Sequence, residues 1–288
     1  MTSRTTLAVA ALLAASLAAC GGGGGGSLPA QTTTAAASHL KAPASATIII
    51  PARASTGSSN ARSPRWISPS TLSLYLKATR SDGFAEGGSQ SLAPSSPNCT
   101  PLAGGARRCV IQFSAPVTTG TLTDEILIQL FDNVDPYFSY TLAQADVFNQ
   151  TVTASGTNAF AFVLGGVVGQ PIAVPSPSPA TVTHGTPATI TIPIAVVDYD
   201  NNPISGLLES PLKITLSSTA SFSFASPAAQ PDGSVSLADT SVTPSITLNY
   251  NGGTTATTLT IATTGTNSAQ IASGATTGFV TPLTITPK

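Results

Sequence analysis

The chain has 288 residues, of which 41% are hydrophobic and only 8% are charged, and its formal net charge is −1. This length allows one or two compact domains, and the apolar fraction is sufficient to build their cores. Charged residues make up about 25% of ordinary soluble proteins, so this composition disfavours long helices and favours β structure. The basic residues are not clustered with aromatic residues, which disfavours nucleic-acid binding.

The N-terminus has the parts of a secretory signal. Arg4 precedes an apolar run from Leu7 to Leu17, which is too short to span a bilayer as a helix. Small residues then lead to Cys20, and six glycines follow it. The Leu17-Ala18-Ala19-Cys20 ending resembles the lipobox of bacterial lipoproteins, which are cleaved before the cysteine and acylated on its thiol. This resemblance implies a signal peptide over residues 1–19, lipidation of Cys20, and export to a bacterial membrane. A plain signal peptide with a chance cysteine is the alternative.

Residues 20–61 are predicted to form a flexible tether after the lipidated cysteine. Polyglycine is followed by Thr, Ala, Ser and Pro, which is a composition typical of linkers. A flexible coil of some forty residues has a span of about 35 Å. Ile48, Ile49 and Ile50 interrupt this segment and predict a short edge strand that ends at Pro51.

A first β module is predicted over residues 62–170. Leu72, Leu74, Leu76 and Ala78 alternate with more polar residues, the period-two pattern of a half-buried strand. Because short strands at close spacing favour a sandwich over βαβ units, we expect an all-β fold. Further strands are predicted at 109–113, 125–131, 140–147 and 158–168. Gly165, Gly166 and Gly169 open no helix and therefore do not predict a phosphate-binding loop.

Cys99 and Cys109 remain as a pair if Cys20 carries lipid. In an oxidising compartment, we expect such a pair to form a disulfide. Closing this small loop would stabilise the fold by roughly 3 kcal/mol in the chain-entropy model. The alternative, a metal or redox pair, lacks both the CxxC spacing and a nearby histidine.

A second module is predicted over residues 171–288. Five prolines between Pro171 and Pro187 mark its start, and the alternation from Thr189 to Val196 predicts a strand in which Pro193 requires an edge position or a bulge. The sequence Asn251-Gly252-Gly253 predicts a hairpin turn. Further strands are predicted at 212–216, 221–225, 245–250, 257–263 and 279–285.

The stretch from Ala195 to Gly206 resembles the bacterial immunoglobulin-like repeats of invasin-type proteins. In those repeats an apolar strand ending in Asp meets a Gly-Asn-Pro turn, and here Asn201 stands where Gly is common. The stretch from Arg62 to Thr71, with the cysteine pair and Phe131-Asp132, is similar to the first module of uncharacterised bacterial lipoproteins. The resemblances imply two tandem immunoglobulin-like β-sandwich domains after a disordered tether.

Few residues could carry catalysis. The only histidines are His39, in the predicted tether, and His184, in the proline-rich connector, which leaves no framework for a Ser/His/Asp or Cys/His site. Two pairs of carboxylates could serve a glycosidase: Asp124 with Glu125, and Asp132 with Asp135. Solvated acids at strand ends are the simpler explanation of both pairs. We therefore expect no enzymatic activity and no cofactor.

Two further groups are candidates for binding. Oxygen-rich turns at the end of a β-sandwich can bind calcium, but Asp and Asn are also common in ordinary turns. Because the sequence lacks the twelve-residue calcium-binding loop pattern, no metal site is predicted. The weak calcium candidate consists of Asp198, Asp200, Asn201 and Asn202. The candidate platform for a sugar or protein ligand consists of Trp66, Tyr137, Phe138 and Tyr140.

Charge is distributed unevenly along the chain. Eight basic and two acidic residues lie between Lys41 and Arg108, whereas ten acidic and two basic residues lie from Cys109 onward. One interpretation is that the basic part is attracted to anionic lipid headgroups or cell-wall polymers. The other is that the uneven distribution arose by chance in a surface with few charges and has no function.

We expect a membrane-anchored envelope or surface lipoprotein with a display, adhesion or structural role. The expected partners are the membrane, through the lipid, and an envelope polysaccharide or another surface protein, with no nucleic acid. A carbohydrate-binding surface module and a periplasmic assembly or scaffold factor are the alternatives, since sandwich folds host many functions.

Overall fold

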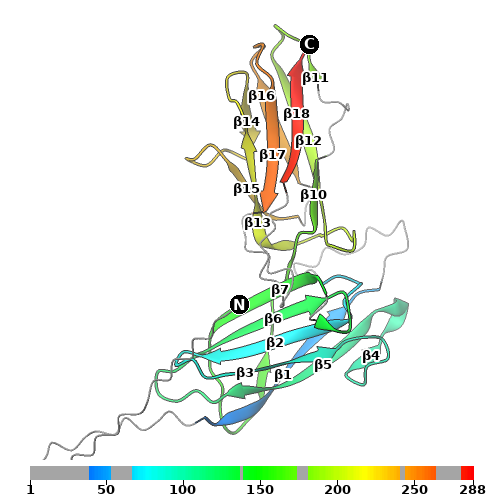
Figure 1. The fold of residues 1–288 in the computed structure, drawn as a ribbon, viewed down its shortest axis with the longest axis vertical. Helices are drawn as coiled ribbons and strands as arrows, with labels where there is room; N and C mark the ends of the chain where they lie inside the picture. Colours follow the sequence, from blue (N-terminus) through cyan, green and yellow to red (C-terminus); the bar gives the residue numbers. More distant parts are fainter. Residues whose placement is uncertain (1–38, 53–66, 137–138, 174–180, 241–243, 264–279) are drawn as a thin grey trace, which may run out of the picture. The chain divides into compact units, whose positions relative to one another are not determined.

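The protein is all-β in the part of the chain that the structure describes (Figure 1). This computed structural model describes residues 39–52, 67–136, 139–173, 181–240, 244–263 and 280–288. They belong to one compact unit, His39–Lys288. Within the described ranges, no helix combines the length and the hydrophobicity needed to cross a membrane.

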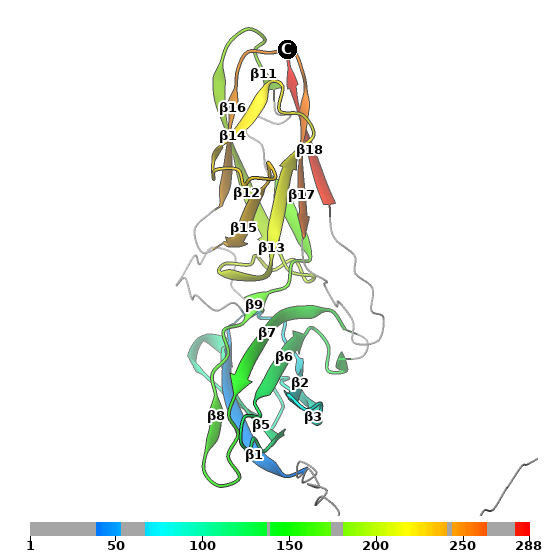
Figure 2. The same cartoon turned by 90° about the vertical axis from the view of Figure 1, so that its left-hand side faces the viewer.

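The first half of this unit is a β-sandwich of two layers (Figure 2). One layer has the strand order β4-β5-β1-β8, with β4 (Cys99–Pro101), β5 (Arg107–Pro116), β1 (Lys41–Ile50) and β8 (Asn158–Phe160). The other layer has the order β3-β2-β6-β7, with β3 (Ala85–Ser91), β2 (Ser73–Arg80), β6 (Asp124–Phe131) and β7 (Thr141–Gln150). A short 3-10 turn, η1 (Ala103–Gly105), precedes β5.

The second half is a sandwich of the immunoglobulin type. One layer has the order β10-β12-β16-β14, with β10 (Gln170–Ala173), β12 (Ala188–Val197), β16 (Ser245–Tyr250) and β14 (Phe222–Ser226). The other has β11 (Thr181–Val182), β18 (Val280–Pro287), β17 (Thr257–Thr263), β13 (Leu207–Leu216) and β15 (Val235–Asp239), with β15 and β17 both paired to β13. These orders correspond to the ABED and GFC sheets of immunoglobulin domains.

The first sandwich follows the same plan. Strands β1, β5 and β4 take the places of B, E and D, and β2, β6 and β7 take those of C, F and G. The place of strand A beside β1 is occupied by β8, which comes late in the chain and runs parallel to β1. The predicted all-β fold with immunoglobulin-like sandwiches is therefore confirmed.

The tether prediction is wrong for Lys41–Ile50, which forms β1. Its alternate residues, from Ala42 through Ile48 to Ile50, are buried in the core. Strand β8 pairs with β1 only at Ala44–Ala46, so residues 48–50 pair with β5 alone and have the predicted edge position, as the end of a longer strand that stops before Pro51. Alanine is a weak strand former, so an Ala-rich strand has the composition of a linker.

The predicted hairpin at Asn251-Gly252-Gly253 is also wrong. Strand β16, before the turn, pairs with β12 and β14, whereas β17, after it, pairs with β13 and β18. The turn therefore crosses from one layer of the sandwich to the other. Pro193 fits its expected position, because pairing of β12 with β10 begins only at the next residue, Ile194.

The predicted disulfide between Cys99 and Cys109 is present in the structure and joins directly opposed residues of β4 and β5. The neighbouring Arg107 is buried, and burial lowers the pKa of its guanidinium. Its side chain donates hydrogen bonds to the backbone oxygens of Leu92, at 2.8 Å, and Thr71. Because these acceptors flank the opposite layer, Arg107 ties the two layers of the first sandwich together.

A glycine seam, Gly165 to Gly169, joins the two sets of strands. It contains β9 (Gly165–Gly166), in which Gly166 pairs with Ala143 of β7 and with Leu208 of β13. A Cβ atom built on Gly165 would lie 2.7 Å from the backbone nitrogen of Glu209, and one built on Gly169 would lie 2.4 Å from the carbonyl carbon of Asp198. Only glycine permits backbones to approach this closely.

We predict that Gly169→Ala lowers the free energy of unfolding by about 1–3 kcal/mol or more, because the added methyl group overlaps the backbone of Asp198 and Tyr199. Urea unfolding of the complete chain measures this change. The matched control is Gly88→Ala in β3, where an added Cβ meets no atom within 4 Å. Equal stability of the two variants would show that the seam tolerates a side chain.

Candidate functional site

The structure brings together residues from both sequence-predicted binding groups. Tyr140 immediately precedes β7, and Tyr199 follows β12 within the acidic turn. Their rings stack with centroids 4.6 Å apart and planes inclined by 6°. Tyr140 remains 45% exposed, whereas Tyr199 is partly buried. We call Tyr140, Tyr199 and the carboxylates around them the tyrosine site.

Asp198 is the buried centre of the acidic turn, with 1% of its surface exposed. Its Oδ1 accepts the backbone N–H groups of Asp200, at 2.9 Å, and Asn202, at 2.7 Å. Its Oδ2 accepts the hydroxyl of Ser68 at 2.7 Å and the side-chain amide of Asn202 at 3.0 Å. Asn201 has the left-handed φ of 61°, a conformation that Asn tolerates. The carboxylate therefore holds the turn in place.

The same turn is hydrogen-bonded to the segment that leads into β2. The Asn202 amide donates to Ser68 Oγ at 3.1 Å and to Ser70 Oγ at 3.2 Å. Ser68 and Asp198 are 130 residues apart in the chain, so this contact closes a long loop. Ser68 had no signal in the sequence, because a lone serine in a turn-rich stretch does not indicate a distant carboxylate.

These contacts change the interpretation of the weak calcium candidate. Four protein donors occupy the oxygens of Asp198, and these hydrogen bonds would compete with a metal ion. In the part of the chain that the structure describes, no group of three or more His, Cys, Asp or Glu residues is arranged to hold a metal ion.

Asp132 adds a third carboxylate to the tyrosine site. Burial raises the pKa of Asp132, and the nearby charges of Asp200 and Asp198 raise it further. Its Oδ1 accepts the backbone N–H of Tyr140 at 3.0 Å, which opposes the shift. The site thus presents the exposed ring of Tyr140 next to the partly buried Asp132, and an exposed ring can contact a sugar or another ligand through stacking.

The other predicted residues are only partly described. Cys20, Trp66, Tyr137 and Phe138 lie outside the described residues. Asp124 is buried and Glu125 is exposed, so this pair points to opposite sides of the sheet as the sequence predicts. The His39 ring packs against Phe84 with the two planes tilted by 38°, and the backbone N–H of His184 donates to the backbone oxygen of Lys288.

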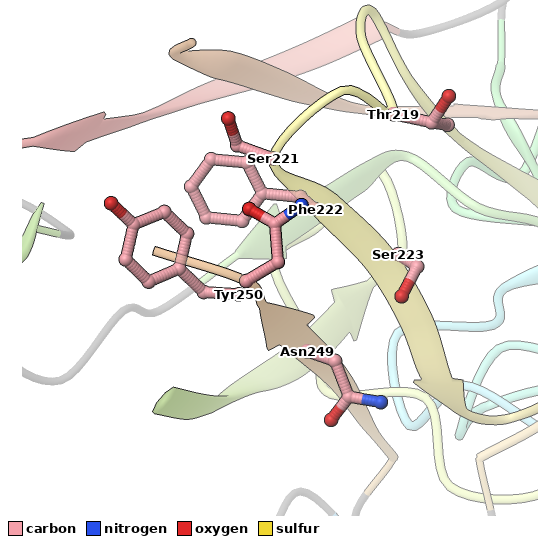
Figure 3. Close-up of a pocket in the computed structure, with 7 residues that line it drawn as sticks. Thr219, Ser221, Phe222, Ser223, Asn249 and Tyr250 are labelled. Carbon is pink, nitrogen blue, oxygen red and sulfur yellow. The ribbon is translucent and has the colours of Figure 1, made fainter. Parts of the chain in front are cut away.

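A small cavity of about 110 Å³ lies at the ends of β14 and β16. Figure 3 shows the Phe222 and Tyr250 rings next to each other in this region, and their centroids are 5.0 Å apart. Typical ligand pockets measure about 300–1,000 Å³, so this cavity suits water or a very small solute. Its lining residues are Thr219, Ser221, Phe222, Ser223, Asn249, Tyr250 and Asn251.

Comparisons with known proteins give no family. No family model matches the chain, and no curated protein matches it. Domains 1–6 of surface layer protein SbsC are 13% identical with a TM-score of 0.25, covering 74% of this chain and 20% of that one. Domains 4 and 5 of S-layer protein SbsC are 14% identical with a TM-score of 0.22, and the match covers 60% of this chain and 68% of that one. The chain thus spans about a fifth of the first of these structures, and likeness at this level assigns neither family nor function.

We predict that Ser68→Ala lowers the free energy of unfolding by about 1–3 kcal/mol, because the buried Asp198 loses one of its donors. Chemical unfolding of the complete chain measures the loss, with Ser89→Ala on the exposed strand β3 as control. A wild-type free energy of unfolding for Ser68→Ala would mean that the contact between these segments does not stabilise the fold.

Proposed function

We propose that the protein is an exported lipoprotein whose β-sandwiches are held at a bacterial membrane, where they have a non-enzymatic display, adhesion or structural role. The observation that carries this proposal is the order of segments at the N-terminus. A basic residue, an apolar run and small residues lead to Cys20, and polyglycine follows it. Multiple acyl chains would supply the signals that stable anchoring requires.

The position of β1 limits the length of the tether in this proposal. Because β1 begins at Lys41, the segment between the lipidated cysteine and the sandwich runs only from Gly21 to Leu40. A flexible coil of about twenty residues has a span of about 25 Å, which is shorter than the span expected from the sequence. A folded module on such a tether stays close to the surface that anchors it.

The use of polar groups in the tyrosine site supports a structural role. Asp198, Asn202 and Ser68 are hydrogen-bonded to one another, so they stabilise the turn and are not poised for proton transfer to a substrate.

We predict that Cys20→Ala prevents acylation, because the thiol is the group that the lipid would modify. Labelling of growing cells with a fatty-acid analogue should give no labelled protein for the variant, and the variant should leave the membrane fraction. Unchanged labelling of Cys20→Ala would contradict the proposal.

Protease treatment of intact cells then distinguishes the roles. Rapid digestion of the sandwiches on whole cells supports display or adhesion, and protection until the outer barrier is opened supports a periplasmic scaffold. The Cys20→Ala variant serves as the control that has lost its anchor.

Carbohydrate binding is a second candidate function, and the exposed ring of Tyr140 beside Asp132 favours it. We predict that Tyr140→Ala reduces retention on an envelope polysaccharide several-fold, because stacking by an aromatic ring contributes about 0.5–1.5 kcal/mol. Affinity electrophoresis in polysaccharide gels measures this retention. The control is Phe148→Ala, which removes another exposed aromatic ring from β7. Equal retention of both variants and the wild type would exclude Tyr140 as a sugar contact.

A further inference from the structure

A buried charged cluster lies at the end of the first sandwich where the chain enters the fold. Arg80, the last residue of β2, is 1% exposed. Its Nε and Nη2 donate to the two carboxylate oxygens of Asp82 at 2.9 and 2.8 Å, and its Nη1 donates to the backbone oxygen of Val117 at 2.7 Å. Asp124, the first residue of β6, is paired with Arg80 in the ladder between β2 and β6. We call Arg80, Asp82 and Asp124 the entry cluster.

The entry cluster supports the first described residues of the chain. The backbone N–H of Val117 donates to the backbone oxygen of Leu40 at 2.8 Å, directly before β1. The guanidinium of Arg80 lies 5.4 Å from the centroid of the Phe84 ring, and that ring is 4.6 Å from the imidazole of His39. These contacts therefore connect the entry cluster to residues 39–41.

Asp124 is the unusual member of the cluster. It is 1% exposed, yet neither of its carboxylate oxygens receives a hydrogen bond. Burial raises the pKa of Asp124 to about 6; the charge of Arg80 opposes this shift, and the charge of Asp82 adds to it. An ionised carboxylate in this position lacks both water and donors, which is an unfavourable state.

Among the described residues, two charged side chains shift the pKa of Asp124. Arg80 and Asp82 act on it from the end of β2 and the following turn. On the other side, the residue opposite Asp124 in β7 is the neutral Gln150. The adjacent Glu125 is exposed and interacts with Asp146, whose pKa burial and Glu125 raise to about 6. Asp146 is thus a second titrating group that the experiment must separate from Asp124.

We propose that Asp124 is a pH-dependent lock on the entry end of the first sandwich. When the carboxyl is protonated, the end of β6 packs against Arg80 and Val117 with no buried charge in excess. When it ionises, the buried charge favours opening of this end to water, which loosens the segments 80–84 and 117–124 and the attachment of residues 39–41. This proposal does not depend on the proposed function.

The sign of the effect follows from proton binding. The folded state retains the Asp124 proton up to about pH 6, whereas an unfolded Asp loses it near its ordinary pKa of about 3.9. Between these values the unfolded state binds fewer protons, so stability falls as the pH rises. Above about pH 6 both states are ionised and this loss remains constant. A shift of about two units corresponds to a change on the order of 100-fold in the unfolding equilibrium constant.

The test is urea unfolding of the complete chain between about pH 4.5 and about pH 7.5, with Asp124→Asn and the control Asp146→Asn. In the wild type the Asp124 carboxyl alone should raise the unfolding constant between tenfold and 100-fold over this range, and Asp146 adds a rise of its own. Asp124→Asn should abolish the part of the rise that is due to Asp124 and should be at least as stable as the wild type at the higher pH. Asp146→Asn should retain the part of the pH-dependent rise in the unfolding constant that is due to Asp124. An undiminished pH dependence in Asp124→Asn would overturn the proposal.

Hydrogen exchange of the wild type provides a second test that needs no variant. After correction for the intrinsic pH dependence of exchange, the segments 39–41, 80–84 and 117–124 should exchange several-fold faster at about pH 7.5 than at about pH 5. Strand β16 in the other sandwich is the internal control. Equal changes in β16 and in these segments would show that Asp124 does not act locally, and would also overturn the proposal.

Discussion

The close approach of backbones along the glycine seam is the constraint on which the other contacts depend. Gly165 lies against Leu208 and Glu209, and Gly169 lies against Asp198 and Tyr199, at separations that leave no space for a Cβ atom. Because β9 can then pair with both β7 and β13, one ladder continues from the strands of the first sandwich to those of the second. The same approach places Asp198 within reach of Ser68, and Tyr199 against Tyr140.

Two buried carboxylates show how differently this fold treats negative charge. Asp198 and Asp124 are each 1% exposed. Hydrogen bonds from two backbone N–H groups, a hydroxyl and an amide offset the lost hydration of Asp198. Asp124 receives no hydrogen bond to offset its lost hydration, so burial raises its pKa. Hydrogen bonding, and not burial itself, therefore distinguishes the surroundings of these two acids.

Local patterns in the sequence predicted the strands with strong alternation of β-branched or large apolar residues, such as β2, β6 and β12. They failed for β1, because its buried positions begin with Ala42, Ala44 and Ala46, residues that also occur in linkers. Turn chemistry located the bend at Asn251-Gly252-Gly253 but could not determine whether the flanking strands pair, because pairing depends on the whole sheet order. The tyrosine site was found only in part: Tyr140 and Asp198 had signals, whereas the roles of Ser68 and Gly169 arise from packing between distant segments.

The low content of charged residues gives a few acids unusual influence over the pH response. The chain has only twelve Asp and Glu residues, so each perturbed carboxyl is a large share of the titrating groups below neutrality. Asp124 and Asp146, with pKa values raised to about 6, favour the folded state at mildly acidic pH and lose this contribution as the pH rises. The Arg80 guanidinium lowers the pKa of Asp82, and Lys213 lowers that of Asp232, so these pairs contribute above the ordinary Asp pKa and lose their contribution as the pH falls below it. The two effects have opposite signs and act on either side of the ordinary Asp pKa of about 3.9, so these four carboxyls together favour the folded state most near that pH.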